Sequence, residues 1–201
     1  MSTLTFPQLS SAPATFSCSL IPNTQIFESP LNRTLQTLEL PGARWVVEME
    51  FNGISAADGR TLKAFMAKLR GMAGRFYYGD YSHKAPAGSA AGTPLVNGAS
   101  QSGGSLVTDG WDANQANLLL PGDYVGINGE LKIITETIAS DADGNATLVF
   151  EPPMRTSPAD NTAVVTQFPK CTFRLQDDEQ DLIIIDPERR PTVAIKAVEV
   201  F

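Results

Sequence analysis

The chain of 201 residues carries 15 basic and 22 acidic side chains, which gives a net charge of −7. Charged residues make up 18% of the sequence against about 25% in an average protein, while 16 glycines and 14 prolines are present. This composition excludes a coiled coil and a wholly disordered chain, and it favours short elements joined by turns. No lysine or arginine occurs between Lys84 and Lys132. The clustered cations that bind nucleic-acid phosphates or anionic lipids are therefore missing.

We expect neither a membrane span nor a secretory signal. No run approaches the roughly 18 apolar residues of a spanning helix, and the first residues do not combine a basic start with an apolar stretch. Two cysteines, Cys18 and Cys171, are too few for a disulfide framework. We therefore expect a protein made in a reducing cytoplasm, with both thiols free and buried.

The first forty residues are predicted to form extended segments separated by Pro22 and Pro30, because proline removes a hydrogen-bond donor from a strand. Residues 34–40 alternate as a strand does, and Pro41–Gly42 predicts a turn after them. Residues 44–52 form the clearest early strand, with one apolar face and one charged face. The apolar face holds Trp45, Val47, Met49 and Phe51, and the other holds Arg44, Glu48 and Glu50.

A single amphipathic helix is predicted over residues 55–70. Ser55 can cap its first turn, with Asp58 as a shortened capping box. The apolar stripe at positions i, i+3, i+4 and i+7 consists of Leu62, Phe65, Met66 and Leu69. Arg70 should lie in the last turn, and Gly71 should take the left-handed conformation that ends the helix.

The composition changes after an aromatic strand at residues 75–78. Residues 85–105 are rich in Ala, Gly and Ser, which predicts a linker or a long surface loop. Residues 106–168 alternate short apolar runs with turns, the strongest at Asn128–Gly129, and predict a small inserted β-domain. Residues 169–201 offer strands at 171–175, 182–185 and 192–200. We expect these strands to return to the domain begun by residues 1–84.

Few residues are candidates for chemistry, and none forms a recognised constellation. His83, the single histidine, lies in a loop without a nucleophile motif, so we interpret it as a solvated residue. Residues 141–145 (DADGN) resemble the start of a calcium loop, but their spacing fits a hairpin turn better. The acidic residues of 177–181 are interpreted as a solvated tip between strands. The sequence thus predicts no catalytic, cofactor or metal site and no enzyme. A hydrolase would depend on His83 and the acidic tip alone.

A second interpretation comes from the aromatic residues. Exposed rings can stack on sugars, although core and interface packing is the commoner use of such side chains. The candidates are Trp111, Tyr124, Phe76, Tyr77 and Tyr78. The alternative function is therefore a carbohydrate-binding module or adhesin that acts through the inserted domain, with Trp111 or Tyr124 as stacking residues.

One segment, residues 44–82, carries a more specific pattern. It runs from a Trp-bearing strand to a helix with an Ala-Phe pair, then Leu-Arg-Gly, then an aromatic strand ending in Gly-Asp. In this order it resembles a signature of the distal tail or tail-tip (baseplate) proteins of long-tailed, non-contractile bacteriophages. The matching residues are Trp45, Ala64, Phe65, Leu69, Arg70, Gly71, Phe76, Gly79 and Asp80. Later similar pieces are Gly122-Asp123, Ala146-Thr147-Leu148 and Pro152-Pro153-Met154-Arg155.

The resemblance implies a mainly β fold with one amphipathic helix, a split β-barrel or sandwich core, and an additional small β-barrel or sandwich domain. It also implies a virion structural protein that forms a ring of six copies between the tail tube protein and the baseplate hub. DNA would pass through the lumen of such a ring without sequence-specific binding. The extra domain of this chain is inserted after Ser82, whereas the best-known members carry theirs appended.

Overall fold

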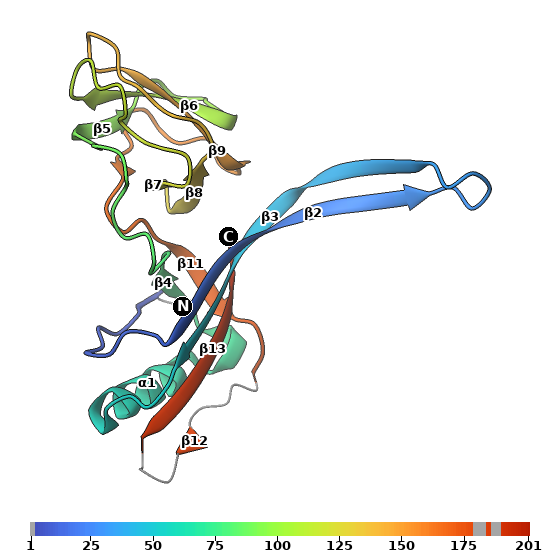
Figure 1. Cartoon of the computed structure of the whole chain (residues 1–201), viewed down its shortest axis with the longest axis vertical. Helices are drawn as coiled ribbons and strands as arrows, with labels where there is room; N and C mark the ends of the chain where they lie inside the picture. Colours follow the sequence, from blue (N-terminus) through green and yellow to red (C-terminus); the bar gives the residue numbers. More distant parts are fainter. Residues whose placement is uncertain (1–2, 179–183, 186–189) are drawn as a thin grey trace.

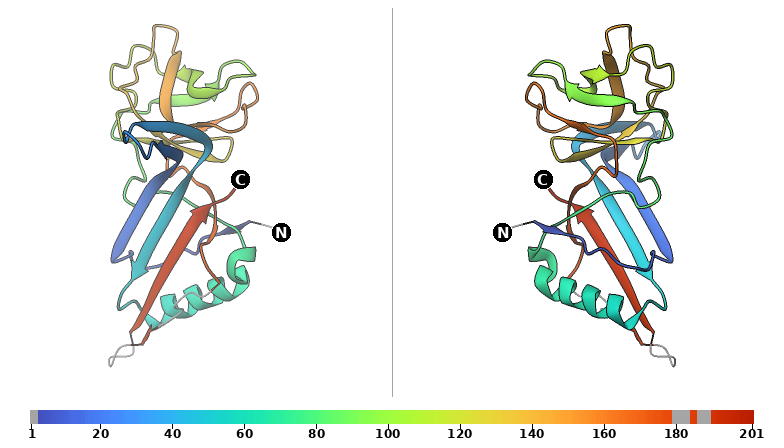
Figure 2. Two further views of the ribbon diagram at one scale, coloured as in Figure 1. Left: turned by 90° about the vertical axis from the view of Figure 1, so that its right-hand side faces the viewer. Right: turned by 90° about the vertical axis from the view of Figure 1, so that its left-hand side faces the viewer.

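The computed structural model describes residues 3–178, 184–185 and 190–201. The described chain is mainly β, with two sheets and one α-helix (Figure 1). One sheet and the helix form the lower body of the molecule and the second sheet lies above them, as the two side views also show (Figure 2), while a long hairpin projects to the side. The mainly β fold with one helix is therefore confirmed.

The first sheet contains strands from both ends of the chain. Its order is β1-β4-β11-β13-β3-β2, with β12 paired to β13, and all pairs except β1–β4 are antiparallel. The strands are β1 (Leu4–Thr5), β2 (Thr15–Glu28), β3 (Leu35–Phe51), β4 (Phe76–Tyr78), β11 (Cys171–Leu175), β12 (Ile184–Ile185) and β13 (Pro191–Glu199). The predicted strands at 171–175 and 192–200 thus join the sheet of the N-terminal strands. Of the predicted strand at 182–185, residues 182 and 183 lie outside the described residues.

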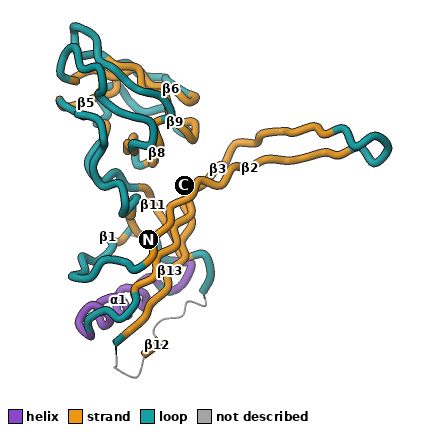
Figure 3. Tube along the Cα trace, viewed as in Figure 1, coloured by secondary structure: helices purple, strands orange, loops and turns teal. Residues whose placement is uncertain are grey.

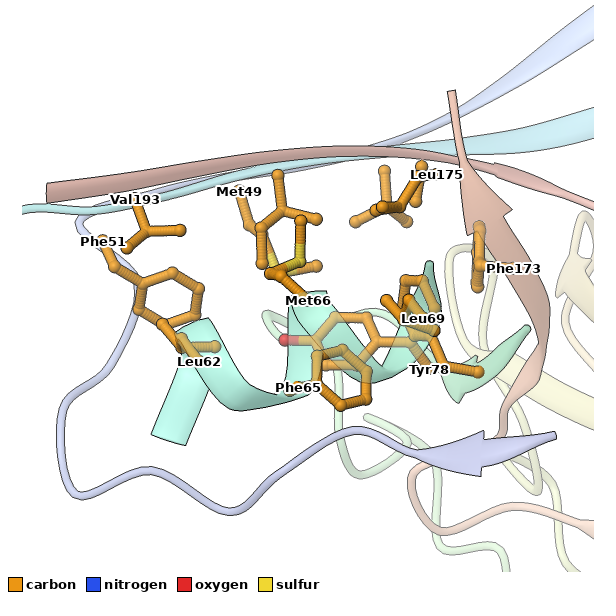
Figure 4. Packing of buried hydrophobic residues seen from close by; sticks show 14 of the residues in the cluster. Met49, Phe51, Leu62, Phe65, Met66, Leu69, Tyr78, Phe173, Leu175 and Val193 are labelled. Carbon is orange, nitrogen blue, oxygen red and sulfur yellow. The ribbon is translucent and has the colours of Figure 1, made fainter. Parts of the chain in front are cut away.

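The helix α1 (Ala56–Leu69) packs on one face of this sheet (Figure 4). Its predicted stripe is confirmed, since all four stripe residues are buried. They meet the alternating side chains of β3, of which Trp45, Val47, Met49 and Phe51 are at most 2% exposed. Apolar residues that recur every 3.6 positions on the helix and every second position on the strand therefore form the two sides of one core.

The ends of α1 differ in detail from the prediction. The Ser55 hydroxyl accepts from the backbone N–H of Asp58 at 3.1 Å, as a capping residue does. The Asp58 carboxylate does not reach back toward Ser55; it accepts hydrogen bonds from Ser10 and Ser11. At the other end Arg70 already has φ +55, so the helix ends one residue earlier than predicted. Its N–H bonds to the Ala67 carbonyl, and a short 3₁₀ turn (Gly71–Ala73) follows.

The second sheet closes almost into a barrel. Its order is β10-β7-β8-β9-β6-β5. The two outer strands approach each other, because Leu95 forms an isolated bridge with Ala163 and the Val96 N–H donates to the Thr162 carbonyl at 2.9 Å. The strands are β5 (Gly92–Val96), β6 (Gly103–Trp111), β7 (Tyr124–Ile127), β8 (Glu130–Ile134), β9 (Ala146–Met154) and β10 (Val164–Val165). The predicted hairpin turn at Asn128–Gly129 is confirmed, with φ of +51 and +80.

The predicted linker at 85–105 is only partly correct. β5 lies inside it and pairs with β6, which itself begins at Gly103. Pro94 and Val96 are buried, so even this Ala- and Gly-rich stretch contributes to the barrel core. The β-domain therefore begins before residue 106, because two apolar side chains on alternate positions suffice for a short outer strand.

The predicted turn at Pro41–Gly42 is wrong. β3 continues through both residues, and β2 likewise continues through Pro22. The register between the two strands shifts between Ile21 and Asn23, and Gly42 has φ +110 at the same level. The side-chain amide of Asn23 donates to the Pro41 carbonyl at 2.9 Å. The prolines are tolerated because they lie at this irregularity, where the ladder is interrupted in any case.

Candidate interaction surface

The most unusual feature of the structure is the distal part of the β2–β3 hairpin, residues 21–40, here called the arm. Its base lies beside residues 152–155, and from there it leaves the body and ends in a turn that lies away from the other described elements (Figure 3). At about 3.3 Å per residue, the eight steps from Leu20 to Glu28 extend for about 26 Å. Six of the eleven large hydrophobic side chains that are exposed in the described chain lie in it, namely Ile21, Ile26, Phe27, Leu31, Leu35 and Leu38. The apolar surface of this protein is thus concentrated on its least supported element.

Both faces of the arm carry apolar side chains. Ile26 pairs with Thr37, and Glu28 pairs with Leu35, so Ile26, Glu28 and Leu35 share one face. Phe27 pairs with Gln36 and Leu38 pairs with Gln25, and these lie on the opposite face. An isolated two-stranded ribbon is marginally stable in water. An arm of this composition is better explained by burial between other surfaces than by exposure to solvent.

The base of the arm is fixed by a partly buried ion pair. Arg155 at the end of β9 donates to both carboxylate oxygens of Glu199 on β13, at 2.9 and 2.7 Å. Glu199 is 2% exposed and also accepts from the backbone N–H of Trp45, while Arg155 donates to the Ala43 carbonyl at 2.8 Å. The pair thus joins the barrel, the C-terminal strand and the strand that continues into the arm. Bidentate geometry of this kind also restricts their relative orientation.

Trp45 strengthens the same junction. Its indole N–H donates to the Leu131 carbonyl of β8 at 2.8 Å, and its ring lies 5.5 Å from that of Tyr124 on β7. Both rings are buried. Trp45 and Arg155 belong to the pieces that the family resemblance singled out, but no sequence pattern indicated Glu199 as their partner. Side chains 44 residues apart have no local signal that pairs them.

A cleft of about 480 Å³ lies on the opposite side of the body from the arm. One wall is the loop between β1 and β2, which Figure 1 shows at the left of the molecule, whereas the arm extends to the right. Buried rings of Phe51 and Tyr78 form the floor. The other wall lies where the chain passes from the first sheet to the second after β4 and returns between β10 and β11. It consists of Tyr77, Tyr81, Lys84, Phe168 and Lys170. Its volume lies within the range of about 300–1,000 Å³ that is usual for binding sites.

The cleft wall contributed by the β1–β2 loop is fixed at two points. Phe6 inserts among the core rings, 4.8 Å from Tyr78 and 5.2 Å from Phe65. Ser10 and Ser11 bond the Asp58 carboxylate on α1, with the Ser10 hydroxyl at 2.6 Å. These hydrogen bonds, the Ser10 hydroxyl first, lower the pKa of Asp58 to about 2. The loop is therefore held in place without any ligand.

The cationic wall has a strained backbone. Phe168 has φ +41, a conformation that bulky residues rarely adopt, and its N–H bonds to the Lys84 carbonyl at 2.6 Å. The Lys84 ammonium lies 3.7 Å from the centre of the Tyr81 ring, and that of Lys170 lies 4.9 Å from the Phe168 ring. None of the described residues that line the cleft is acidic, although the chain has a net charge of −7. This cleft therefore favours an apolar group that carries a negative charge.

The polar residues considered in the sequence are not brought together. His83 is exposed and lies 3.2 Å from Asp80. Asp141 accepts from the backbone N–H groups of Asp143 and Asn145, which is the predicted turn. Of the acidic tip, Asp178 accepts from the Met72 N–H, and residues 179–181 lie outside the described residues. Within the described ranges no three His, Cys, Asp or Glu side chains are placed to hold a metal ion.

Both candidate sugar-stacking residues are buried. Trp111 is 5% exposed and its indole N–H bonds Thr108 at 2.8 Å, while Tyr124 is 7% exposed. Phe76 and Tyr78 also lie in the core, and only Tyr77 keeps a substantial exposed fraction. The expectation that Trp111 or Tyr124 offers a free ring is wrong, because both are needed to fill their own cores. The carbohydrate alternative loses the two residues that motivated it.

The two cysteines are free, as predicted for a chain without a disulfide framework. Cys171 is buried, whereas Cys18 is only partly so. Burial, with a smaller effect of the Asp80 carboxylate, raises the pKa of Cys18 to about 12. Burial also raises the pKa of Cys171. Neither thiol is therefore a good nucleophile at neutral pH.

Comparisons with known proteins leave the family open. No protein-family model matches the sequence, and a search of curated proteins finds no match. Among the described residues no helix has both the length and the hydropathy to cross a bilayer.

Proposed function

We propose that this chain is a virion structural protein of a bacteriophage tail tip, where copies assemble into a ring that joins the tail tube to the baseplate hub. The observation that carries the proposal is the arm, an apolar ribbon with two uncovered faces. Such an element gains stability when an adjacent subunit covers it, since burial of apolar surface is the main drive for association. The ordered resemblance of residues 44–82 to tail-tip proteins supplies the identity of the assembly.

The placement of the arm and the cleft supports a ring in particular. Identical contacts made head to tail close into a ring when the rotation between copies permits it. A subunit in such a ring needs two different faces, and Figure 1 shows the arm and the β1–β2 loop on opposite sides of the body. The resemblance implies six copies, with the tail tube protein and the hub as partners, and a site of action in the virion after assembly in the bacterial cytoplasm.

Two measurements test this function. Light scattering after size-exclusion chromatography, followed by electron microscopy, should reveal ring-shaped multimers of the purified chain. Mass spectrometry of purified phage particles should detect its peptides. A chain that stays monomeric at every concentration and is absent from the particles would contradict the proposal.

A variant of the arm makes the first measurement specific. Replacing Ile26, Phe27 and Leu31 by Ser should abolish the multimer and leave the melting temperature of the subunit nearly unchanged, since these side chains are exposed. The matched control replaces Val107 and Val165, exposed apolar residues of the barrel, by Ser. It should assemble normally. Equal losses in both variants would show that the arm has no special role.

A further inference from the structure

We infer that the tip of the arm, residues 26–35, seats in the aromatic cleft of the next copy. This inference rests on the proposed function, because it states where one subunit of the ring contacts its neighbour. The occupant is thus a second copy of this chain. Three observations carry it: the chemistry of the tip, the chemistry of the cleft, and their positions on the molecule.

The tip of the arm and the cleft are complementary in charge and in apolar character. Leu31 at the turn is 96% exposed and Leu35 is 64% exposed, and Glu28 is the cross-strand partner of Leu35. The tip therefore presents apolar side chains beside one carboxylate. In the cleft, the exposed Tyr77 ring and the partly buried Tyr81 and Phe168 rings lie beside two ammonium groups, and no acidic side chain is among its described lining residues.

In the inferred contact, Leu31 and Leu35 lie against the rings and Glu28 lies between Lys84 and Lys170. A carboxylate at this position is attracted by the two ammonium groups, because the described lining residues of the isolated subunit include no acid. The tip also carries Arg33, whose N–H bonds to the Ser29 carbonyl and whose φ is +54. In this arrangement the Arg33 side chain remains outside the cleft, because the ammonium groups repel it.

The positions of the two surfaces fit a head-to-tail contact. The arm reaches about 26 Å from the core, which suffices to cross from one subunit onto the next. The cleft is already formed, because its loop wall is fixed by Phe6 and by the Ser10 and Ser11 bonds to Asp58. A preformed cleft lowers the entropic cost of receiving the arm. The remaining apolar face of the arm, with Phe27 and Leu38, is then available to the body of the neighbouring copy.

Cysteine cross-linking tests the contact directly. A full-length Leu31→Cys chain is mixed with a chain that carries Gln8→Cys, an exposed residue of the cleft lining, and is treated with a short bismaleimide. The native thiols are suitable background, since both have raised pKa values and react slowly. We expect a cross-linked dimer from this mixture, and a ladder up to the closed ring from the double variant. The matched control pairs Leu31→Cys with Ser102→Cys, an exposed residue of the barrel, and should give background only.

Charge reversal provides an independent readout. Glu28→Lys should weaken self-association about tenfold, and adding Lys84→Glu with Lys170→Glu should restore most of the loss. Arg33→Glu should leave association unchanged or strengthen it. Melting temperatures of all variants establish that the exposed substitutions leave the subunit folded.

The outcomes separate this inference from the proposed function. If the chain forms rings but Leu31→Cys and Gln8→Cys do not cross-link above the control, the arm docks elsewhere and only this inference is overturned. Rings that tolerate Glu28→Lys and are lost with Arg33→Glu overturn the pairing in the same way. A chain that never multimerises and is absent from particles contradicts both proposals.

Discussion

The near and far halves of the β2–β3 hairpin have similar alternating sequences but opposite environments. In the near half, Met49 and Phe51 alternate with exposed or half-exposed residues and are covered by α1 and the core (Figure 4). In the far half, Leu35 and Leu38 are more than half exposed. The two halves are continuous strands, so the difference lies in what covers them. The comparison teaches that alternating apolar residues predict a strand but do not reveal whether the surface that buries them belongs to the same chain.

The largest loss of stability is expected from a substitution that disrupts the packing of α1 on the near half of the hairpin. Leu69→Asp places a carboxylate at a position that is 0% exposed, on the helix face that packs against the sheet. An unpaired buried charge costs several kcal/mol, which is comparable to the whole stability of a domain. We expect loss of cooperative unfolding by circular dichroism. The control is Ala64→Asp, exposed on the same helix, for which about 0.7 kcal/mol is expected.

A matched pair of truncations in β3 tests the comparison itself. Met49→Ala should lower the free energy of unfolding by about 2–5 kcal/mol, because Met49 is 2% exposed and its removal leaves a cavity. Leu38→Ala in the same strand is 51% exposed and should change it by less than about 0.5 kcal/mol. Chemical denaturation of the monomeric subunit measures both. Similar losses for the two variants would mean that the arm packs within its own chain.

Arg155→Met should uncouple the arm base from the barrel. It leaves the Glu199 carboxylate buried without its cation, at a cost of about 3 kcal/mol. The control is Lys196→Met, which removes an exposed pair with Glu48 at 3.4 Å and should cost less than about 1 kcal/mol. Differential scanning calorimetry can follow both. If the barrel and the sheet body depend on this pair for their coupling, Arg155→Met should also split the single transition into two.

The sequence predicted those parts of the fold whose signals are local. Each of these signals is contained within a few neighbouring residues: the apolar stripe of the helix, the alternation of the strand at 44–52, and the Asn128–Gly129 turn. The arm was missed because Pro22 and Pro41 read as strand breaks, although the register irregularity accommodates both. β5 was missed because only Pro94 and Val96 are buried in an Ala- and Gly-rich stretch.

The candidate surfaces were harder to predict than the fold. The cleft combines residues 5–13 with Lys84 and Lys170, and the arm base joins Arg155 to Glu199. These contacts arise only when the two sheets are placed next to each other, so no pattern along the chain contains them. The burial of Tyr124 has the same origin, because this β7 residue packs into the core of the first sheet, whereas Trp111 is buried in the core of its own sheet.

The smallest effect concerns the loop that forms the cleft wall, and it depends on pH. The pKa of Asp58 is about 2 in the folded chain, against 3.8 as its ordinary value, chiefly because Ser10 donates to it. A lowered folded-state pKa stabilises the fold above the ordinary value, and this contribution is lost as the pH falls toward 2. Replacing Ser10 and Ser11 by Ala should therefore lower the melting temperature at pH 7, and the difference from the natural chain should shrink below about pH 4. Replacing the exposed Ser17 and Ser19 of β2 by Ala is the control and should give no such pH dependence. A difference that stays constant from pH 7 to pH 3 would show that the serines act by packing and not through the Asp58 carboxylate.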